Sequence, residues 1–353
     1  MVDGKPTTLL VGVNGAGKST IRDVIEILQR IGRGPGVVED LVVARDKTRW
    51  GHDHYIIIEV SVELAGQPLE YSVAFEVDPI SQAVKIATER LSSNSWKIFD
   101  RQDVHLVTRL TEEHEVAFEL DPKQLALSII GPPQSHPIEE FRKWLRNILI
   151  VAPIPQLMNG ISERGTLFPT ADMENLSEWF RELIVQFPDS YANVTGFLQN
   201  YMGDLISIQN EQAGRETRRL QFVFGDPKSK EPFEFKELSD GEKCLMVAAM
   251  VVAHSARFQP TLCFWDEPES HIGISLLQRF ISDLKRGSGK VGQLIATSQN
   301  AETIRTFSQE NILILGRRDH RSRPVVTKAS ELKNKGDLAD AFARGDFIGG
   351  PGV

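Results

Sequence analysis

The sequence has little cysteine, no long apolar run and no leader pattern. Only two cysteines occur among the 353 residues, Cys244 and Cys263, and neither lies in a C-x-x-C pair. A disulfide framework is therefore not expected, and the reducing cytoplasm suits the chain. No stretch of 18 apolar residues occurs, so the sequence predicts no membrane-spanning helix. The first eight residues lack the basic and then apolar pattern of a secretion signal.

Positive charge is also scarce, because 40 Lys and Arg face 48 Asp and Glu, and the formal net charge is −8 at pH 7. A protein that coats nucleic acid needs clustered basic side chains for its phosphate contacts, so this balance argues against that class of protein. One local basic segment exists at 317–335. It could contact a nucleic-acid backbone, but a solvated loop is the favoured alternative, because no aromatic residues for base stacking are interleaved. The candidate contacts are Arg317, Arg318, Arg321 and Arg323.

The pattern of apolar residues changes along the chain. Residues 7–11 form a short apolar run, typical of a buried strand, and a glycine-rich turn and a helical pattern follow. Between 38 and 130 apolar and polar residues alternate, which predicts an inserted antiparallel β lobe with one solvated face. The range 131–232 is predicted to be mostly helical, and 233–316 returns to apolar strands separated by helices. Since alternating strands and helices imply a parallel sheet, we predict one α/β domain over 1–353 whose two ends share a sheet.

The glycine-rich turn and the start of its helix, residues 12–19, match the phosphate-loop pattern G-x-x-x-x-G-K-[ST] in full. Its glycines let backbone N–H groups close around phosphate oxygens, and the helix N-terminus adds partial positive charge. Lys18 is expected to reach the β- and γ-phosphates, Ser19 to hold Mg²⁺ and Thr20 to touch the α-phosphate. A glycine turn that binds nothing is the alternative, and the strand before and the helix after argue against it. The remaining residues of the predicted ATP site are Asn14, Gly15 and Gly17.

A second apolar strand, 262–265, ends in two carboxylates, Asp266 and Glu267. In open α/β sheets, ligands bind at the carboxyl ends of the strands. We therefore expect Asp266 in the Mg²⁺ shell, and Glu267 as the base that accepts a proton from the attacking water. Two acids after a strand are often only the entrance to a solvated loop. The phosphate loop elsewhere in the chain favours the catalytic interpretation.

A third motif, Leu-Ser-Asp-Gly-Glu-Lys at 238–243, precedes a buried helical pattern. Ser239 or Asp240 is predicted to cap that helix. A capped helix N-terminus is itself a site for anions, so a structural role and a role in phosphate binding are compatible. The residues expected to carry both roles are Ser239, Asp240 and Gly241.

Together these motifs resemble the nucleotide-binding domains of ABC ATPases, in the branch with SMC proteins, RecF and the bacterial OLD-like ATPases. The segment 238–243 is similar to the ABC signature, and Trp-Asp-Glu-Pro-Glu-Ser-His at 265–271 is similar to the extended Walker B motif and D-loop of that branch. The resemblance covers 5–32 and 233–316, and 338–345 is similar to the tail of compact members. It implies the P-loop NTPase fold of the ABC/SMC head type.

The resemblance also implies a function: a cytoplasmic ATPase whose two copies close head-to-tail around ATP and Mg²⁺. Each ATP would lie between Lys18 of one copy and the signature motif of the other, and hydrolysis through Glu267 would release the dimer. Compact members often belong to bacterial antiphage defence or DNA-repair systems. Since no nuclease motif is visible in the sequence, the resemblance implies that the chain gates a separate effector, a nuclease or a toxin.

One position departs from the family pattern. Members of this branch usually carry a histidine after the strand that follows Walker B, and here Gln299 stands in its place. A glutamine amide can hydrogen-bond the γ-phosphate but cannot titrate, so we predict slow hydrolysis or turnover that needs a partner. The alternative is a nearly non-hydrolysing, ATP-dependent scaffold that holds a toxin or nuclease. The energy subunit of a membrane transporter is a third interpretation, and the long inserted region argues against it.

Two further features stay open. Gln134 and Gln156 are both candidates for the glutamine that joins the lobes and touches Mg²⁺, and the sequence does not decide between them. Gly273 stands where compact members often have a histidine in the D-loop.

Overall fold

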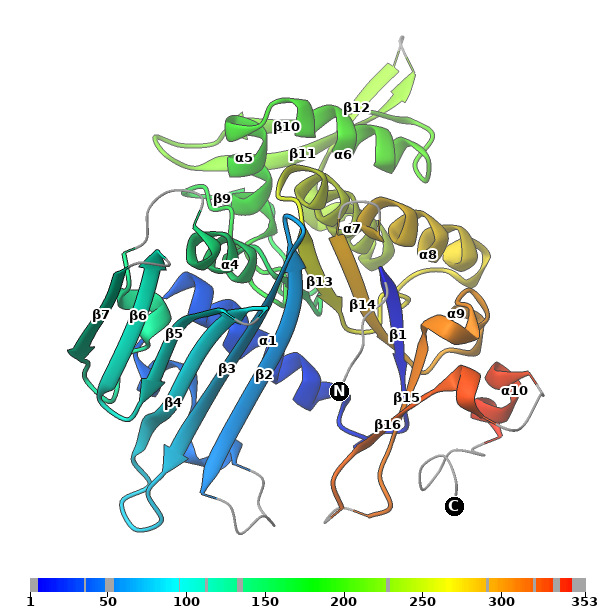
Figure 1. Cartoon of the computed structure of the whole chain (residues 1–353). Helices are drawn as coiled ribbons and strands as arrows, with labels where there is room; N and C mark the ends of the chain where they lie inside the picture. The colour runs from blue at the N-terminus through cyan, green and yellow to red at the C-terminus, as the bar shows by residue number, and fades with distance from the viewer. Residues whose placement is uncertain are drawn as a thin grey trace. The chain divides into compact units, whose positions relative to one another are not determined.

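The chain forms two compact units, one made of Met1–Thr20 with Leu149–Val353 and the other of Ile21–Ile148 (Figure 1). Among the residues that the structure describes, no helix is long and apolar enough to cross a membrane. The computed structural model describes residues 6–34, 36–47, 54–94, 96–111, 114–131, 136–226, 229–289, 292–319, 322–332 and 337–344.

The first unit is built on a six-stranded sheet with the order β16-β15-β1-β14-β13-β8. All neighbouring pairs are parallel except β15 and β16, which are antiparallel. Every residue of β13 and β15 is buried, as expected for parallel strands covered on both faces. The predicted parallel core that joins the two ends of the chain is therefore confirmed. The strands are β1 (Thr7–Val11), β8 (Leu149–Val151), β13 (Thr261–Trp265), β14 (Gly292–Ser298), β15 (Ile312–Gly316) and β16 (Val325–Lys328).

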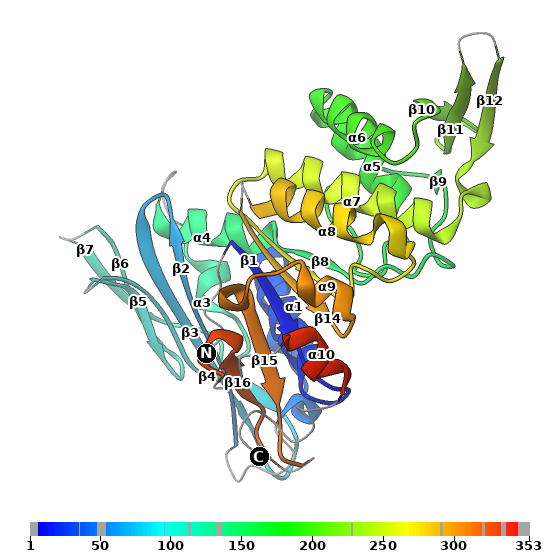
Figure 2. The ribbon, with the colours of Figure 1, turned by 90° about the vertical axis from the view of Figure 1, so that its right-hand side faces the viewer.

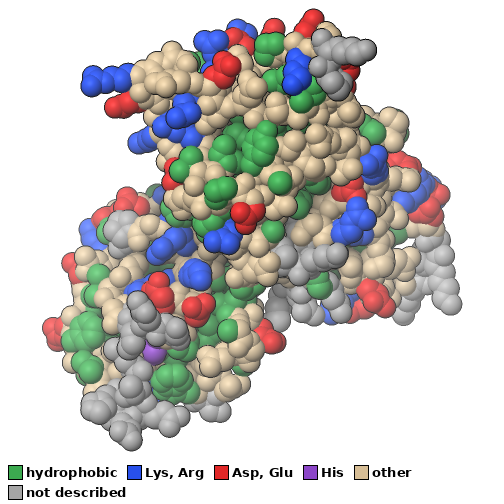
Figure 3. All heavy atoms as spheres, turned by 90° about the horizontal axis from the view of Figure 1, so that it is seen from above, with side chains coloured by type: hydrophobic (Ala, Val, Ile, Leu, Met, Phe, Trp, Pro, Cys, Tyr) green, Lys and Arg blue, Asp and Glu red, His purple; other side chains and the backbone are tan. Residues whose placement is uncertain are grey.

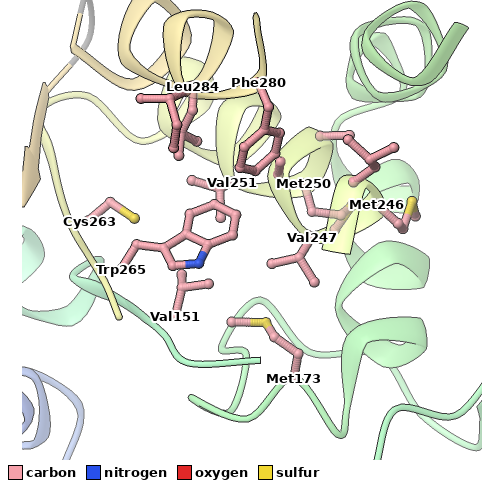
Figure 4. Close-up of a cluster of buried hydrophobic side chains, with 14 of the residues drawn as sticks. Val151, Met173, Met246, Val247, Met250, Val251, Cys263, Trp265, Phe280 and Leu284 are labelled. Atoms are coloured by element: carbon pink, nitrogen blue, oxygen red, sulfur yellow. The ribbon is translucent and has the colours of Figure 1, made fainter. Parts of the chain in front are cut away.

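Helix α7 (Asp240–Arg257) supplies much of the core of this unit. Its segment 243–251 is buried without interruption, which is typical of a helix enclosed on all sides. Trp265 at the end of β13 is fully buried and meets Phe280 edge to face, with ring centroids 6.2 Å apart. Figure 4 shows this indole beside side chains of α7 and of α8 (Ile274–Gly289), with Val151 and Met173 below it in the view. The same unit contains α9 (Ala301–Arg305) and α10 (Leu338–Ala343).

The prediction that 131–232 is mostly helical is wrong. The described part of this range contains three helices, but it also contains β8 and a separate antiparallel sheet with the order β10-β11-β12, in which β9 pairs with β11. A bulge between Leu205 and Ser207 shifts the alternation of β10, so its buried residues Leu205 and Ile208 are three apart, as in a helix. The elements are α4 (Pro137–Arg146), α5 (Leu176–Gln186), α6 (Asp189–Gln199), β9 (Ile161–Ser162), β10 (Leu205–Gln212), β11 (Arg218–Asp226) and β12 (Ser229–Glu234).

The second unit contains the predicted antiparallel meander, whose six strands pair in chain order from β2 to β7. From Leu69 to Val77 every second residue of β3 is buried, with Ala74 buried in addition, and this alternation is the pattern from which the sheet was predicted. Helices α1 (Lys18–Arg33), α2 (Val38–Leu41), α3 (Ala126–Ile129) and α4 accompany it; α1 begins at the end of the first unit. The strands are β2 (Tyr55–Leu64), β3 (Gln67–Val77), β4 (Val84–Ser93), β5 (Trp96–Gln102), β6 (His105–Thr111) and β7 (His114–Glu119).

A buried polar cluster lies in this second unit. Glu89 on β4 and Arg101 on β5 stand opposite each other and are fully buried. Arg101 donates to the carbonyl oxygens of Asp103, at 2.6 Å, and Asp121, at 2.9 Å. Glu89 accepts a hydrogen bond of 3.0 Å from the Tyr71 hydroxyl and two more from the backbone at the start of α3. Buried charges are tolerated only with such partners, so this cluster is interpreted as structural.

Candidate functional site

The phosphate loop joins β1 to α1. Gly15 and Gly17 have φ angles of +79° and +109°, which favour glycine because it has no Cβ. The backbone N–H of Ala16 donates to the carbonyl of Val13 at 3.0 Å and closes a turn. The ammonium of Lys18 donates to the carbonyl of Gly12 at 2.5 Å, so the side chain folds back over the loop.

Lys18 of the phosphate loop interacts electrostatically with the two acids that follow β13. Burial lowers the pKa of the Lys18 ammonium, and the negative charges of Glu267 and Asp266 oppose that shift. The predicted phosphate-binding cation and the two predicted acids therefore lie close enough to interact. They come from segments that are about 250 residues apart in the sequence.

Thr297 holds the two acids in place. The parallel register puts Trp265 beside Ala296, so the residues that follow both strands meet at one edge of the sheet. The buried Thr297 hydroxyl donates to Oδ1 of Asp266 and accepts from the backbone N–H of Glu267 at 3.0 Å. Sequence reasoning missed Thr297; the only available signal was a hydroxyl residue at the end of a strand next to the acidic one.

The backbone of Glu267 is strained. Its φ angle is +48°, in the left-handed region that non-glycine residues rarely adopt. Such a conformation costs on the order of 1–3 kcal/mol and persists where surrounding contacts hold it. The hydrogen bond from its N–H to Thr297 is one such contact.

Gln299 links the two halves of the site. Its side-chain Nε2 donates to Oδ1 of Asn14 in the phosphate loop at 2.9 Å and to Oε1 of Glu267 at 3.3 Å. A single amide therefore contacts the loop and the predicted catalytic base. The structure brings together three residues that the sequence analysis selected separately.

Glu269 is a further acid that the sequence analysis did not select. Its Oε1 accepts a hydrogen bond from the Ser298 hydroxyl, while Oε2 is buried and has no hydrogen-bond partner among the described residues. Burial raises the pKa of the Glu269 carboxyl, and the negative charge of Glu267 raises it further. This carboxyl therefore binds a proton more readily than an exposed glutamate does.

The signature segment begins α7 as predicted, and Ser239 is the N-cap. Its hydroxyl accepts from the backbone N–H of Glu242 at 3.3 Å, and the Glu242 carboxylate accepts from the backbone N–H of Ser239 at 2.8 Å. This reciprocal capping box satisfies two backbone donors. Among the described residues, no hydrogen bond joins the signature residues 239–241 to the phosphate loop of the same chain.

Asp240 is held by two neighbours. Nε2 of Gln156, in the segment after β8, donates to Oδ2 of Asp240 at 3.1 Å, and Nδ1 of His271 lies 3.9 Å from the same oxygen. Gln156 thus contacts the signature rather than the acids of β13. The other candidate glutamine, Gln134, lies outside the described residues, as does Arg321.

The oxygen donors at the loop and the strand end suit a magnesium ion. Mg²⁺ takes hard oxygen ligands, usually one or two from the protein together with water and substrate phosphate. The Ser19 hydroxyl and the Asp266 carboxylate are donors of this kind. Within the described ranges, no cluster of three or more His, Cys, Asp or Glu could hold a metal ion, so these residues do not form an all-protein metal cage.

Comparison with solved structures identifies the fold. The chain is similar to an SMC head bound to the C-winged helix domain of ScpA, with a TM-score of 0.52 and 16% identity over 92% of this chain and 90% of that chain. It is also similar to the SMC head domain from Thermotoga maritima, with a TM-score of 0.47 and 12% identity over 93% and 92% of the two chains. At this identity the first likeness shows the fold alone.

Sequence comparison gives the family. None of the curated proteins with which the chain was compared matches it. The family described as "AAA domain, putative AbiEii toxin, Type IV TA system" matches residues 7–305, which span both the phosphate loop and the acids of β13. The chain therefore belongs to this AAA family and has the fold of an ABC/SMC-like P-loop ATPase.

Proposed function

We propose that the chain binds ATP with Mg²⁺ at the phosphate loop and hydrolyses it. One observation carries this proposal: the Gln299 amide contacts both Asn14 of the phosphate loop and Glu267 at the end of β13. Phosphoryl transfer to water requires a phosphate-binding cradle, a metal ligand and a group that orients or deprotonates the water. These three kinds of group meet at one edge of the sheet.

Each residue has a distinct proposed role. The N–H groups of the loop, including those of Gly15 and Gly17, and the Lys18 ammonium bind the phosphates, and Thr20 contacts the α-phosphate. Ser19 and Asp266 hold Mg²⁺, which neutralises phosphate charge when bound. Glu267 accepts the proton of the attacking water, with its backbone held by Thr297.

The contact between Gln299 and Glu267 supports slow hydrolysis. The Gln299 amide holds the Glu267 carboxylate through this hydrogen bond. The glutamine cannot exchange a proton with the water or with Glu267. The same observation favours the second candidate function, an ATP-dependent scaffold or sensor that binds ATP, hardly hydrolyses it and holds a toxin or nuclease.

A head-to-tail dimer completes the proposed site. Ser239, Asp240 and Gly241 lie at the N-terminus of α7, which is a suitable place for a phosphate, yet they make no hydrogen bond to their own phosphate loop. In the proposed dimer they bind the ATP held by Lys18 of the second copy. We also propose that all of 1–353 serves as one ATPase domain, with its inserted lobes at 38–130 and 131–232 and its closing segment at 233–316.

The biological setting is proposed from the family. Its description names a putative toxin of a Type IV TA system, which supports a role in bacterial defence. The cytoplasmic location, the separate effector and DNA repair as the second setting are proposed from the resemblance of the motifs. Placement in the RecF/OLD-like branch is part of this proposal. Nucleic-acid contact through the exposed Arg318 and Arg323 is a weaker proposal. On the face shown in Figure 3, basic and acidic side chains of the described residues are interspersed.

The test uses Glu267→Gln, which retains the site but removes the proposed base. The variant is expressed with its neighbouring genes, and its native mass is measured with and without Mg-ATP. We expect the 39.5 kDa chain to double in mass only with Mg-ATP, with or without an additional bound chain. The double variant Lys18→Ala, Glu267→Gln is the control and should stay monomeric. A monomer of Glu267→Gln in both conditions would contradict ATP-driven dimerisation.

The two candidate functions differ in turnover. Steady release of phosphate by the wild-type protein, lost in Glu267→Gln, supports the ATPase. Tight ATP binding with almost no phosphate release, even when the neighbouring gene products are present, supports the scaffold.

A further inference from the structure

β15 ends next to the phosphate loop. β15 pairs in parallel with β1, with Val11 beside Ile314, so both strands end at the same edge of the sheet (Figure 2). β16 then returns antiparallel, and its last pair joins Gly316 to Val325. The described residues that follow β15 and precede β16, 317–319 and 322–324, therefore lie at the end of the sheet where the phosphate loop begins.

Three glycines of the phosphate loop are covered by this hairpin. A methyl group on Gly12 would lie 2.7 Å from the carbonyl oxygen of Leu315, so no side chain is accommodated there. One on Gly17 would lie 3.1 Å from Cγ of Pro324, and one on Gly15 would lie 3.4 Å from Nη2 of Arg317. The guanidinium of Arg317 therefore lies against the loop that is proposed to bind phosphate. The three pairs are Gly12 with Leu315, Gly15 with Arg317, and Gly17 with Pro324.

Arg317 differs from its neighbours in the basic segment. Its side chain is half-buried, whereas Arg318 and Arg323 are exposed. It makes no hydrogen bond or ion pair with any other described residue. A guanidinium that is partly removed from water and has no such partner among the described residues is suited to bind a ligand.

The order of the strands indicates which end of the nucleotide lies near Arg317. β14 and β13, with Asp266, Glu267 and Gln299, lie on one side of β1, and β15 lies on the other. In the proposed function the γ-phosphate faces the acids and their water. The α-phosphate and the nucleoside must then lie toward β15, where Arg317 is located.

We infer that Arg317 binds the nucleoside end of the bound nucleotide, with its guanidinium plane against the base. This inference rests on the proposed function and adds a residue that determines nucleotide affinity. A guanidinium stacks on aromatic faces, and it is planar where a lysine ammonium is not. The geometry assigns Arg317 to the nucleotide rather than to a nucleic-acid backbone.

The test compares two nucleotides with a ligand that has the phosphates but no nucleoside. Equilibrium binding of MgATP, MgADP and magnesium tripolyphosphate to the full-length protein is measured by calorimetry for the wild type and Arg317→Ala. We expect affinity for MgATP and MgADP to fall by about tenfold, the size of a partly desolvated cation–π contact, and affinity for tripolyphosphate to stay unchanged. Arg317→Lys should recover only part of the loss, because it restores the charge without the plane.

Arg318→Ala is the matched control, because it removes the same charge from an exposed neighbour in the same loop. We expect it to bind all three ligands as the wild type does. An equal loss of tripolyphosphate affinity in Arg317→Ala would place the guanidinium on the phosphate chain and overturn the inference. Unchanged MgATP affinity would overturn it as well. Failure of the proposed function is distinct: wild type and Lys18→Ala would then both fail to bind MgATP.

Discussion

Gln299 is the residue through which the phosphate loop and the proposed base are in contact. Its amide donates to both Asn14 and Glu267, so it holds the carboxylate in the geometry that the structure shows. A histidine at this place could also donate to the γ-phosphate, and it could carry a proton at neutral pH.

We therefore expect Gln299→His to raise basal ATP hydrolysis by roughly tenfold, which is below the range usual for a well-placed general acid or base. Phosphate release under saturating MgATP measures the effect. Gln309→His, at an exposed position, is the control and should leave the rate unchanged. A rate in Gln299→His that is equal to or lower than that of the wild type would contradict this interpretation of the residue.

Glu269 provides a prediction about pH. Burial raises its pKa above the ordinary 4.5, so just above pH 4.5 the folded chain keeps a proton that the unfolded chain has released. The free energy of unfolding contributed by this group therefore falls as the pH rises through the window between the two pKa values. Glutamine does not titrate, so Glu269→Gln should lack this dependence. Melting temperatures of both proteins between pH 4.5 and neutral pH are compared, and a constant difference across that range would refute the prediction.

At the scale of elements, the N-terminus of α7 serves both stability and the proposed dimer. Ser239 caps the helix, and loss of such a cap costs about 1 kcal/mol in the free energy of unfolding. We expect Ser239→Ala to show this loss and, in the Glu267→Gln background, to weaken ATP-dependent doubling of the mass. Asp337 caps α10, and its carboxylate accepts a hydrogen bond of 2.8 Å from the backbone N–H of Ala339. Asp337→Ala removes this cap and is the control. This control should lose a similar amount of stability but dimerise normally. If both variants dimerise equally well, Ser239 has only a structural role.

The elements that could be predicted are those whose signal lies in consecutive residues. The phosphate loop, the acidic end of β13 and the cap of α7 each occupy fewer than ten residues, and each has a local physical reason. β10 was missed because its bulge changes the phase of alternation between Leu205 and Ile208. A strand that breaks period two locally loses the alternation that most clearly distinguishes it from a helix.

At the scale of the whole molecule, the contacts that could not be predicted join distant segments. Thr297 holds Asp266 and Glu267 only because β13 and β14 are neighbours in register, and Arg317 meets Gly15 only because β15 lies beside β1. Strand order in a sheet depends on the packing of all the layers and is not encoded near any one residue. The sequence analysis therefore grouped Arg317 with the other arginines of its segment.

The place of β1 inside the sheet also has a consequence for synthesis on the ribosome. Both neighbours of β1, β14 and β15, follow it by roughly 290 residues or more, which take about 15 to 60 s to translate. The phosphate loop thus leaves the ribosome early but acquires its acids and its covering hairpin almost last. Residues 21–148, which form a unit of continuous sequence, are complete well before that. A nascent or truncated chain would accordingly present a phosphate loop that cannot yet consume ATP.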